Sequence, residues 1–310
     1  MGVPDPFASF AQNREDVVLW RALHTVRDGR YVDVGANDPS QDSITRAFYD
    51  AGWRGITVEP MPACAERHRA ERPGDLLVEA AVTATGGGTV TLHEVEGTGL
   101  STLDDALGAG HREHGYTVRD IEVPARTLNE ILEAAGWAGT EIQLMTVDVE
   151  GAEAEALQGL DLSRWRPWVL VIEATRPQTT EPSHGPWEPM VVGAGYELCL
   201  FDGLSRFYVA REHAAELGPA LSYPATPLDE FTTLDQRRAR AEIDAKAAEI
   251  DRLNQVSHEN WTRLVATDDE LTRLRGEHDR VVAHIAAMED SVSWRVTRPL
   301  RAVRARRAGS

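Results

Sequence analysis

Short β-rich stretches alternate with helical stretches through the first two thirds of the chain, and this alternation limits the fold more than any other feature. The strand-like runs lie at residues 30–34, 55–58, 76–82, 142–147, 168–172, 196–201 and 206–209. The last two flank a tight turn at Asp202 and Gly203, as in a terminal hairpin. Strands that alternate with helices form a mainly parallel sheet covered on both faces. The sequence therefore predicts an α/β, Rossmann-like domain with a mainly parallel seven-stranded sheet.

The domain boundaries follow from changes in composition. We expect a helical lead-in at 1–29, the sheet domain at 30–215 and a proline-containing linker at 216–236. Between 89 and 95 a further β-rich run is typical of a hairpin, and we expect the polar stretch from 96 to 123 to interrupt the alternation.

The segment 237–290 lacks proline and carries apolar residues in a heptad pattern. With Ile243 at position a, the apolar residues at a and d are Ile243, Ile250, Leu253, Leu264, Leu271, Leu274, Val281, Ile285 and Met288. Such a seam predicts a C-terminal α-helical coiled coil. Polar residues interrupt it at Lys246, Ser257, Asn260, Thr267 and His278. A single amphipathic helix folded back on the domain would give a similar pattern.

Charge is distributed unevenly. The formal net charge of -18 disfavours nucleic-acid binding, which requires clustered basic residues to neutralise phosphates. The tail at 291–310 is the exception, because six arginines follow Asp290 without any acidic residue. Trp294 lies among these arginines, so we expect peripheral contact with an anionic membrane surface or with a protein partner. A disordered basic tail is the alternative.

The scarcity of lysine and cysteine excludes several chemistries. Lys246 is the single lysine and lies outside the sheet domain, so a P-loop or a Schiff-base lysine is excluded there. Cys64 and Cys199 are far apart and form no metal-binding spacing. The N-terminus has no signal-peptide pattern, and no apolar run approaches the length of a membrane span. We therefore expect a cytoplasmic protein.

Two strand ends predict a nucleoside-binding crevice. The sequence DVGAN, residues 33–37, ends the first predicted strand, and Glu59 ends the second. In such sheets ligands lie at the carboxyl ends of the strands, where Gly35 would let the backbone approach a cofactor and Glu59 would accept both ribose hydroxyls. A nicotinamide enzyme would use a similar acid, but it would also need GxGxxG, and the glycines after Gly35 are missing. A cationic, phosphate-free cofactor fits better.

Three carboxylates end the later strands beside the same crevice. They are Asp148, Glu150 and Glu173, and they could orient a hydroxyl, act as a general base or coordinate a divalent cation. Glu150 and Glu153 also begin a helix, so they could instead complement its dipole.

Together these motifs resemble the FkbM family of methyltransferases. The resemblance spans about residues 10–209 and rests on six ordered segments: AQNRED (11–16), DVGAN (33–37), VEP (58–60), GLSTL (99–103), RTL (126–128) and DVEGAE (148–153). Many relatives have lysine two residues before the Asp of DVEG, where this chain has Thr146. The resemblance implies a class I methyltransferase fold, S-adenosylmethionine as cofactor and methylation of a hydroxyl, often of a sugar.

The resemblance also implies roles for individual residues. The cofactor site would include Gln12, Asp16, Asp33, Gly35, Asn37, Glu59, Pro60, Ala81 and Val82. We expect Ser101, Thr102, His184 and Trp187 to contact the acceptor, and Asp148 to be the first candidate for the base. The tail around Trp294 is similar to segments that end coiled coils of bacterial surface-polysaccharide enzymes. The expected function is therefore O-methylation of a nucleotide sugar or a glycan, with self-association or recruitment through the coil.

Two other functions remain open on the sequence alone. One is a nicotinamide-dependent oxidoreductase. The other is a non-enzymatic scaffold of polysaccharide assembly in which the coiled coil is the working part.

Overall fold

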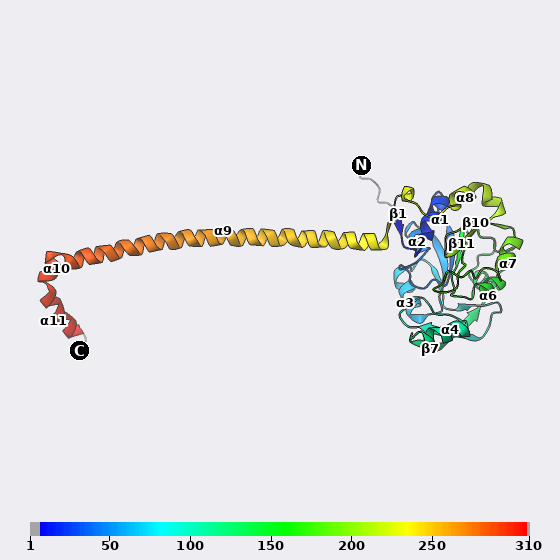
Figure 1. Cartoon of the computed structure of the whole chain (residues 1–310), viewed down its shortest axis with the longest axis horizontal. Helices are drawn as coiled ribbons and strands as arrows, with labels where there is room; N and C mark the ends of the chain where they lie inside the picture. The colour runs from blue at the N-terminus through cyan, green and yellow to red at the C-terminus, as the bar shows by residue number, and fades with distance from the viewer. Residues whose placement is uncertain (1–6, 309–310) are drawn as a thin grey trace. The chain divides into compact units, whose positions relative to one another are not determined.

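The computed structural model describes residues 7–308, and the chain divides into two units at Arg237. The first unit contains all the strands, and the second consists of helix (Figure 1). Within the described residues, no helix has the length and apolar character needed to cross a membrane.

A seven-stranded sheet forms the centre of the first unit. Its strands lie in the order β10 (Tyr196–Phe201), β11 (Ser205–Ala210), β9 (Val169–Glu173), β8 (Leu144–Val147), β2 (Arg30–Val34), β3 (Arg54–Val58) and β4 (Leu76–Val78). The five strands from β9 to β4 are parallel, whereas β11 runs antiparallel to both β9 and β10. The expectation of a mainly parallel sheet that ends in a hairpin is confirmed.

Alternate side chains of these strands enter two different cores. Tyr31 and Phe207 pack in one core with residues of α1 (Glu15–Leu23), α2 (Arg46–Asp50) and α8 (Ala214–Leu221). Val32 and Tyr208 pack in the other with residues of α5 (Leu128–Ala134), α6 (Glu153–Gln158) and α7 (Glu188–Gly193). Because successive residues of a strand point to opposite faces, helices cover both sides of the sheet.

The predicted strand at 76–82 is two strands. β4 belongs to the large sheet, whereas β5 (Ala81–Val82) pairs with β7 (Val118–Arg126) in a second sheet of three strands. The chain turns at Val78, whose carbonyl accepts hydrogen bonds from Glu59 N and Ala80 N.

The second sheet is completed by β6 (Thr89–Val95), which pairs antiparallel with β7. The hairpin partner expected for 89–95 therefore lies across a long connection, and the stretch expected to be irregular contains α4 (Asp105–Glu113) and most of β7. Few apolar residues mark these elements because β7 is largely exposed. Asp104 caps α4 by accepting from Ala106 N and Leu107 N.

The region expected to be a linker, 216–236, is folded onto the first unit. It contains most of α8 and the strand β12 (Phe231–Thr233), which pairs parallel with β1 (Phe7–Ser9). Leu217 and Leu221 are buried, although Pro219 lies within α8. Pro219, Pro224 and Pro227 predict a linker, but burial of Leu217 and Leu221 stabilises structure here.

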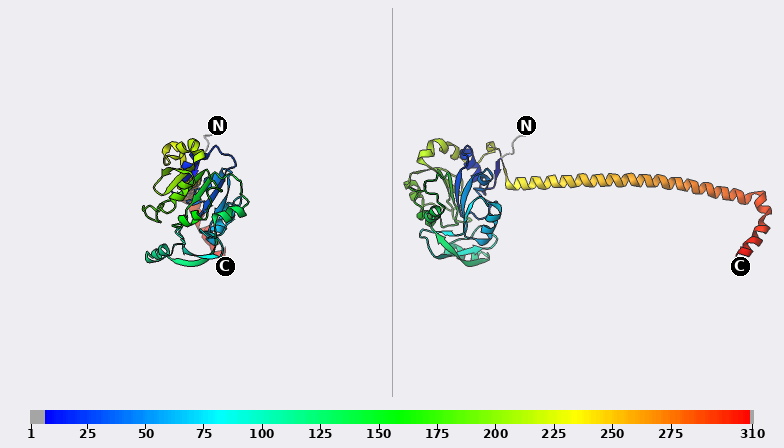
Figure 2. Two further views of the ribbon diagram at one scale, coloured as in Figure 1. Left: turned by 90° about the vertical axis from the view of Figure 1, so that its right-hand side faces the viewer. Right: turned by 180° about the vertical axis from the view of Figure 1, so that it is seen from behind.

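The second unit begins within α9 (Leu234–Asp290), a single helix of 57 residues (Figures 1 and 2). No described residue of α9 is buried, and the apolar heptad residues are exposed, Leu264 by 60%. Two shorter helices follow, α10 (Val292–Val296) and α11 (Arg298–Ala308), and the Arg301 guanidinium stacks 3.7 Å from the centre of the Trp294 ring. Pairing of α9 with another helix stays a prediction.

Candidate active site

The registers of four parallel strands place four motif residues at one edge of the sheet. Val34 pairs with Val58 and with Val147, and Val147 pairs with Ile172. The residues that follow these four are Gly35, Glu59, Asp148 and Glu173. Parallel pairing thus brings together side chains that are up to 138 positions apart in the chain, at the edge where ligands of such sheets bind.

Asp33 lies two residues before Gly35, within β2, and its carboxylate is bound by side chains of the protein. Its carboxylate accepts from the hydroxyls of Thr45 and Thr146, the latter at 2.8 Å, and Arg72 Nη1 lies 3.9 Å from Asp33 Oδ2. Thr146 thus holds this acid through a neutral hydrogen bond. Asp33 supports the turn at Gly35 and borders a pocket with Gln12, Asn37 and Asp148, here called the turn pocket.

Glu59 joins two turns through backbone hydrogen bonds. Its carboxylate accepts from Asn37 N and from Met61 N, each at 2.7 Å. Burial raises the pKa of Glu59 to about 7, against the lowering effect of these two bonds. Asp33 raises this pKa further and Arg67 lowers it. The Glu59 carboxylate has further lone pairs that a ligand could use. A hydrogen bond donated by a ligand hydroxyl would favour the ionised form of Glu59.

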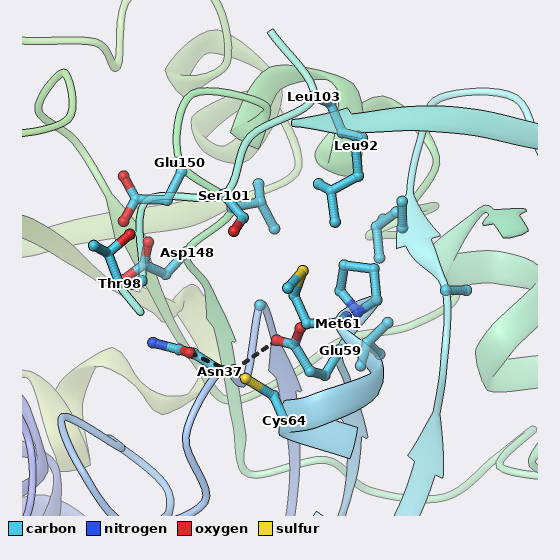
Figure 3. Close-up of a pocket in the computed structure, with 18 residues that line it drawn as sticks. Asn37, Glu59, Met61, Cys64, Leu92, Thr98, Ser101, Leu103, Asp148 and Glu150 are labelled. Atoms are coloured by element: carbon cyan, nitrogen blue, oxygen red, sulfur yellow. Dashed lines mark hydrogen bonds between the residues drawn. The ribbon is translucent and has the colours of Figure 1, made fainter. Parts of the chain in front are cut away.

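Beside Glu59 an apolar pocket extends toward the second sheet. Its apolar residues include Val58, Pro60, Met61, Ala80, Ala81, Val82, Leu92 and Leu103. Figure 3 shows Leu92 and Leu103 on one side of this pocket and the carboxylates of Asp148 and Glu150 on the other. No lysine, arginine or histidine is among the described residues that line it. The pocket therefore offers an apolar side and an acidic side.

The three carboxylates at the strand ends affect one another's protonation. Burial and the nearby charge of Asp148 raise the pKa of Glu173 far above its usual range. Burial also raises the pKa of Asp148, while its hydrogen bond with Glu173 lowers it. Like charges this close cannot both ionise readily, so Glu173 retains a proton and shares it with Asp148.

Glu150 lies where three pockets meet. It borders the apolar pocket, the turn pocket and a polar pocket that also contains Glu173 and Thr175. Burial, followed by the charges of Asp148 and Glu153, raises the pKa of Glu150 to about 8. A carboxylate with a pKa near neutrality is suited to accept a proton at physiological pH.

The backbone conformation of Glu150 is unusual and is held by its neighbours. Its φ is +51°, a left-handed conformation that is uncommon outside glycine and often found at functional sites. The hydroxyl of Thr102 donates to the carbonyl of Glu150 at 2.7 Å. Glu153 accepts from Val149 N and Gly151 N, so Glu153, unlike Glu150, is committed to the start of α6.

The other residues expected at the site occupy different environments. Gln12 borders the polar and turn pockets, and Ser101 borders the apolar pocket. Asp16 borders none of the three and is fully buried, accepting from Ser9 Oγ, Phe10 N and Ala11 N. Its contacts hold the segment that presents Gln12.

His184 and Trp187 also lie outside the three pockets. Trp187 is 1% exposed and packs edge-on against Tyr208 in the core, while His184 Nε2 lies 3.7 Å from Glu188. Neither side chain is placed to contact an acceptor in these pockets.

Among the residues that the structure describes, no group of three or more histidine, cysteine, aspartate or glutamate side chains is arranged to hold a metal ion.

Comparison with known proteins identifies the family. Residues 33–198, more than half of the chain, match the family described as "Methyltransferase FkbM domain". The chain belongs to the FkbM methyltransferase family. A comparison with curated proteins finds no match. Among solved structures, a TehB-like SAM-dependent methyltransferase from Corynebacterium glutamicum is similar at 11% identity and a TM-score of 0.36, covering 63% of this chain and 87% of that one.

This FkbM methyltransferase takes its methyl group from S-adenosylmethionine, and the apolar pocket fits that cofactor. Ala81, Val82, Leu92 and Leu103 would hold the adenine, and Glu59 the ribose hydroxyls. A Cβ at Gly35 would overlap the Asp148 carbonyl, so the turn approaches the strand end as closely as glycine allows. Asp148 and Glu150 supply negative charge where the sulfonium would lie.

Several residues of this site could not be found from motifs. Met61 and Leu92 come from outside the large sheet and are ordinary apolar residues in sequence. Cys64 also borders the pocket, and Arg67 Nη2 donates to its sulfur at 3.2 Å. A signal for Leu103 was available, because the GLSTL segment, residues 99–103, contributes Gly99, Ser101 and Leu103 to the lining of the apolar pocket.

Proposed function

We propose that this methyltransferase transfers the methyl group to a hydroxyl of a saccharide. The observation that carries the proposal is the position of Glu150, which borders both the apolar pocket and the polar pocket. A group there would touch the cofactor and the acceptor at once.

The polar pocket has the composition expected for a polyhydroxylated ligand. Its hydrogen-bonding residues include Gln12, Thr175, Gln178, Thr179 and Thr180. Hydroxyl and amide side chains both donate and accept, as sugar hydroxyls do. A saccharide in this pocket would present one hydroxyl toward Glu150.

The chemistry follows from these positions. S-adenosylmethionine supplies an electrophilic methyl group on a positively charged sulfur. With the cofactor bound, the acceptor hydroxyl would take this methyl group, and the Glu150 carboxylate would accept the hydroxyl proton. Asp148 stabilises the cationic side of the site, and the alignment of the two ligands supplies much of the acceleration.

A binding experiment tests the cofactor site, and a transfer assay tests the acceptor. Calorimetric titration should show binding of S-adenosylmethionine and S-adenosylhomocysteine but not NAD, with loss of binding in Glu59→Ala. Transfer of a labelled methyl group to members of a glycoside panel should follow. If the cofactor binds but only non-saccharide hydroxyls are methylated, the saccharide assignment is incorrect.

We also propose that α9 pairs with a second copy of itself as a parallel coiled coil. The heptad seam is exposed along α9, and the flanking positions are complementary in charge. In a parallel pair, Arg263 would face Asp268 of the second copy, and Glu270 would face Arg275 of the second copy. None of the described flanking pairs places like charges together in this register.

The oligomeric state tests this pairing. Light scattering should give twice the monomer mass for the full chain and the monomer mass when Leu264 and Leu271 are both changed to aspartate. A monomeric full chain at tens of micromolar would refute the pairing.

Both cysteines, Cys64 and Cys199, are free thiols, and we expect the enzyme to act in the reducing cytoplasm.

A further inference from the structure

The ionisable residues that line the polar pocket are all acidic. Glu150, Glu173 and Glu181 border it, and none of its described lining residues is basic. Arg176 does not line the pocket, and its Nε lies 3.6 Å from Glu181 Oε2 at the rim. An acceptor that enters this pocket therefore meets carboxylates and neutral hydrogen-bonding groups.

Glu173 provides a second and independent sign of a ligand. Its side chain is 6% exposed, and its Oε2 atom is buried without a hydrogen-bond partner. Buried carboxylate oxygens are normally satisfied, so a donor from the acceptor would complete this site.

The wall of the pocket is built to keep its shape. Arg176 N donates to Glu181 O at 2.8 Å and Ser183 N donates to Ala174 O at 2.8 Å, which folds the segment after β9 back on itself. Gln178 Nε2 donates to Tyr116 Oη at 3.2 Å and ties this segment to the residues that follow α4. The acidic wall is therefore part of the folded domain.

We propose that the acceptor site takes a phosphate-free glycan unit, with amino sugars preferred, and rejects sugar nucleotides. This inference rests on the proposed function, because it names the substrate class of that site. Proteins commonly recognise phosphate with arginine or lysine side chains, and neither is among the described residues that line this pocket. A diphosphate would meet the charge of Glu181 and no cation among those lining residues, whereas an ammonium group would favour the ionised forms of Glu150 and Glu173 and pair with them.

A matched set of three ligands tests the charge preference. Methyl glucoside, methyl glucosaminide and UDP-glucose are titrated into the full-length protein saturated with S-adenosylhomocysteine, and binding is followed by saturation-transfer NMR. We expect the glucosaminide to bind at least about tenfold more tightly than UDP-glucose, and added salt to reduce that ratio. The neutral glucoside should lie between them.

Two charge reversals serve as variant and control. Glu181→Lys should narrow the ratio between glucosaminide and UDP-glucose, whereas Glu216→Lys should leave it unchanged, because Glu216 is exposed on α8 and lines none of the three pockets. Equal or tighter binding of UDP-glucose, or no binding of either glycoside, overturns the inference. Failure to bind S-adenosylhomocysteine would instead count against the proposed function itself.

Discussion

Replacement of Gly35 by alanine tests how closely the turn after β2 must approach the backbone after β8. Gly35 has a φ of +80°, and a Cβ there would lie 2.8 Å from the carbonyl carbon of Asp148 and closer still to its oxygen. Both atoms belong to the backbone and cannot rotate away as a side chain could. One of the two turns would have to move.

The expected magnitude has two parts that a control separates. The left-handed conformation costs alanine about 1–2 kcal/mol. Gly52 has a φ of +99°, but a Cβ there would meet nothing within 4 Å, so Gly52→Ala measures the conformational cost alone. Overpacking that shifts the backbone adds about 1–3 kcal/mol. We therefore expect Gly35→Ala to lower the free energy of unfolding by about 2–5 kcal/mol and Gly52→Ala by about 1–2 kcal/mol.

Urea unfolding of both variants measures these losses, and methyl transfer measures the functional effect. A shift of the Asp148 backbone would move the Asp148 side chain with it. If this shift is on the order of 1 Å, the rate of methyl transfer in Gly35→Ala should fall by about 10²-fold. Equal losses of unfolding free energy in the two variants, with unchanged transfer, would show that the close approach is not required.

Three further predictions concern the carboxylates. Glu150→Gln should reduce kcat by about 10²–10⁴-fold, as expected for loss of a general base. Glu173→Gln should retain most of the activity, because Glu173 is already protonated. A larger loss of kcat in Glu173→Gln than in Glu150→Gln would assign the base to Glu173. The affinity for S-adenosylhomocysteine should fall as the pH decreases below about 7, because protonation of Glu59 removes hydrogen-bond acceptors for the ribose. This ligand lacks the sulfonium charge, so the other carboxylates affect its binding less. An affinity measured by calorimetry that stays constant from pH 5.5 to 8 would contradict this prediction. The Tm should be higher near pH 6 than near pH 8.5. Burial raises the pKa of Glu15 to about 8 and that of Glu153 to about 7, so both bind a proton more tightly in the folded state, and this stabilisation is lost as the pH rises through those values. A Tm that increases over this interval would be inconsistent with buried acids of this kind.

Local patterns in the sequence determined the elements of the large sheet and the residues at its strand ends. Short runs rich in apolar and β-branched residues mark β2, β3, β8 and β9, and each run is followed by or ends at a glycine or an acidic residue. Since parallel strands present their carboxyl ends at one edge, the sequence by itself places Gly35, Glu59 and Asp148 together. The heptad pattern likewise indicated α9, because a repeated apolar spacing is a local property.

Contacts between distant segments decided the rest. The division of 76–82 into β4 and β5 depends on pairing with β7, whose residues carry little apolar signal of their own. The protonation of Glu173 depends on its distance from Asp148, and the burial of Trp187 depends on Tyr208. Such properties arise only when separate elements pack, because desolvation and charge–charge interaction depend on distance in space and not on separation along the chain.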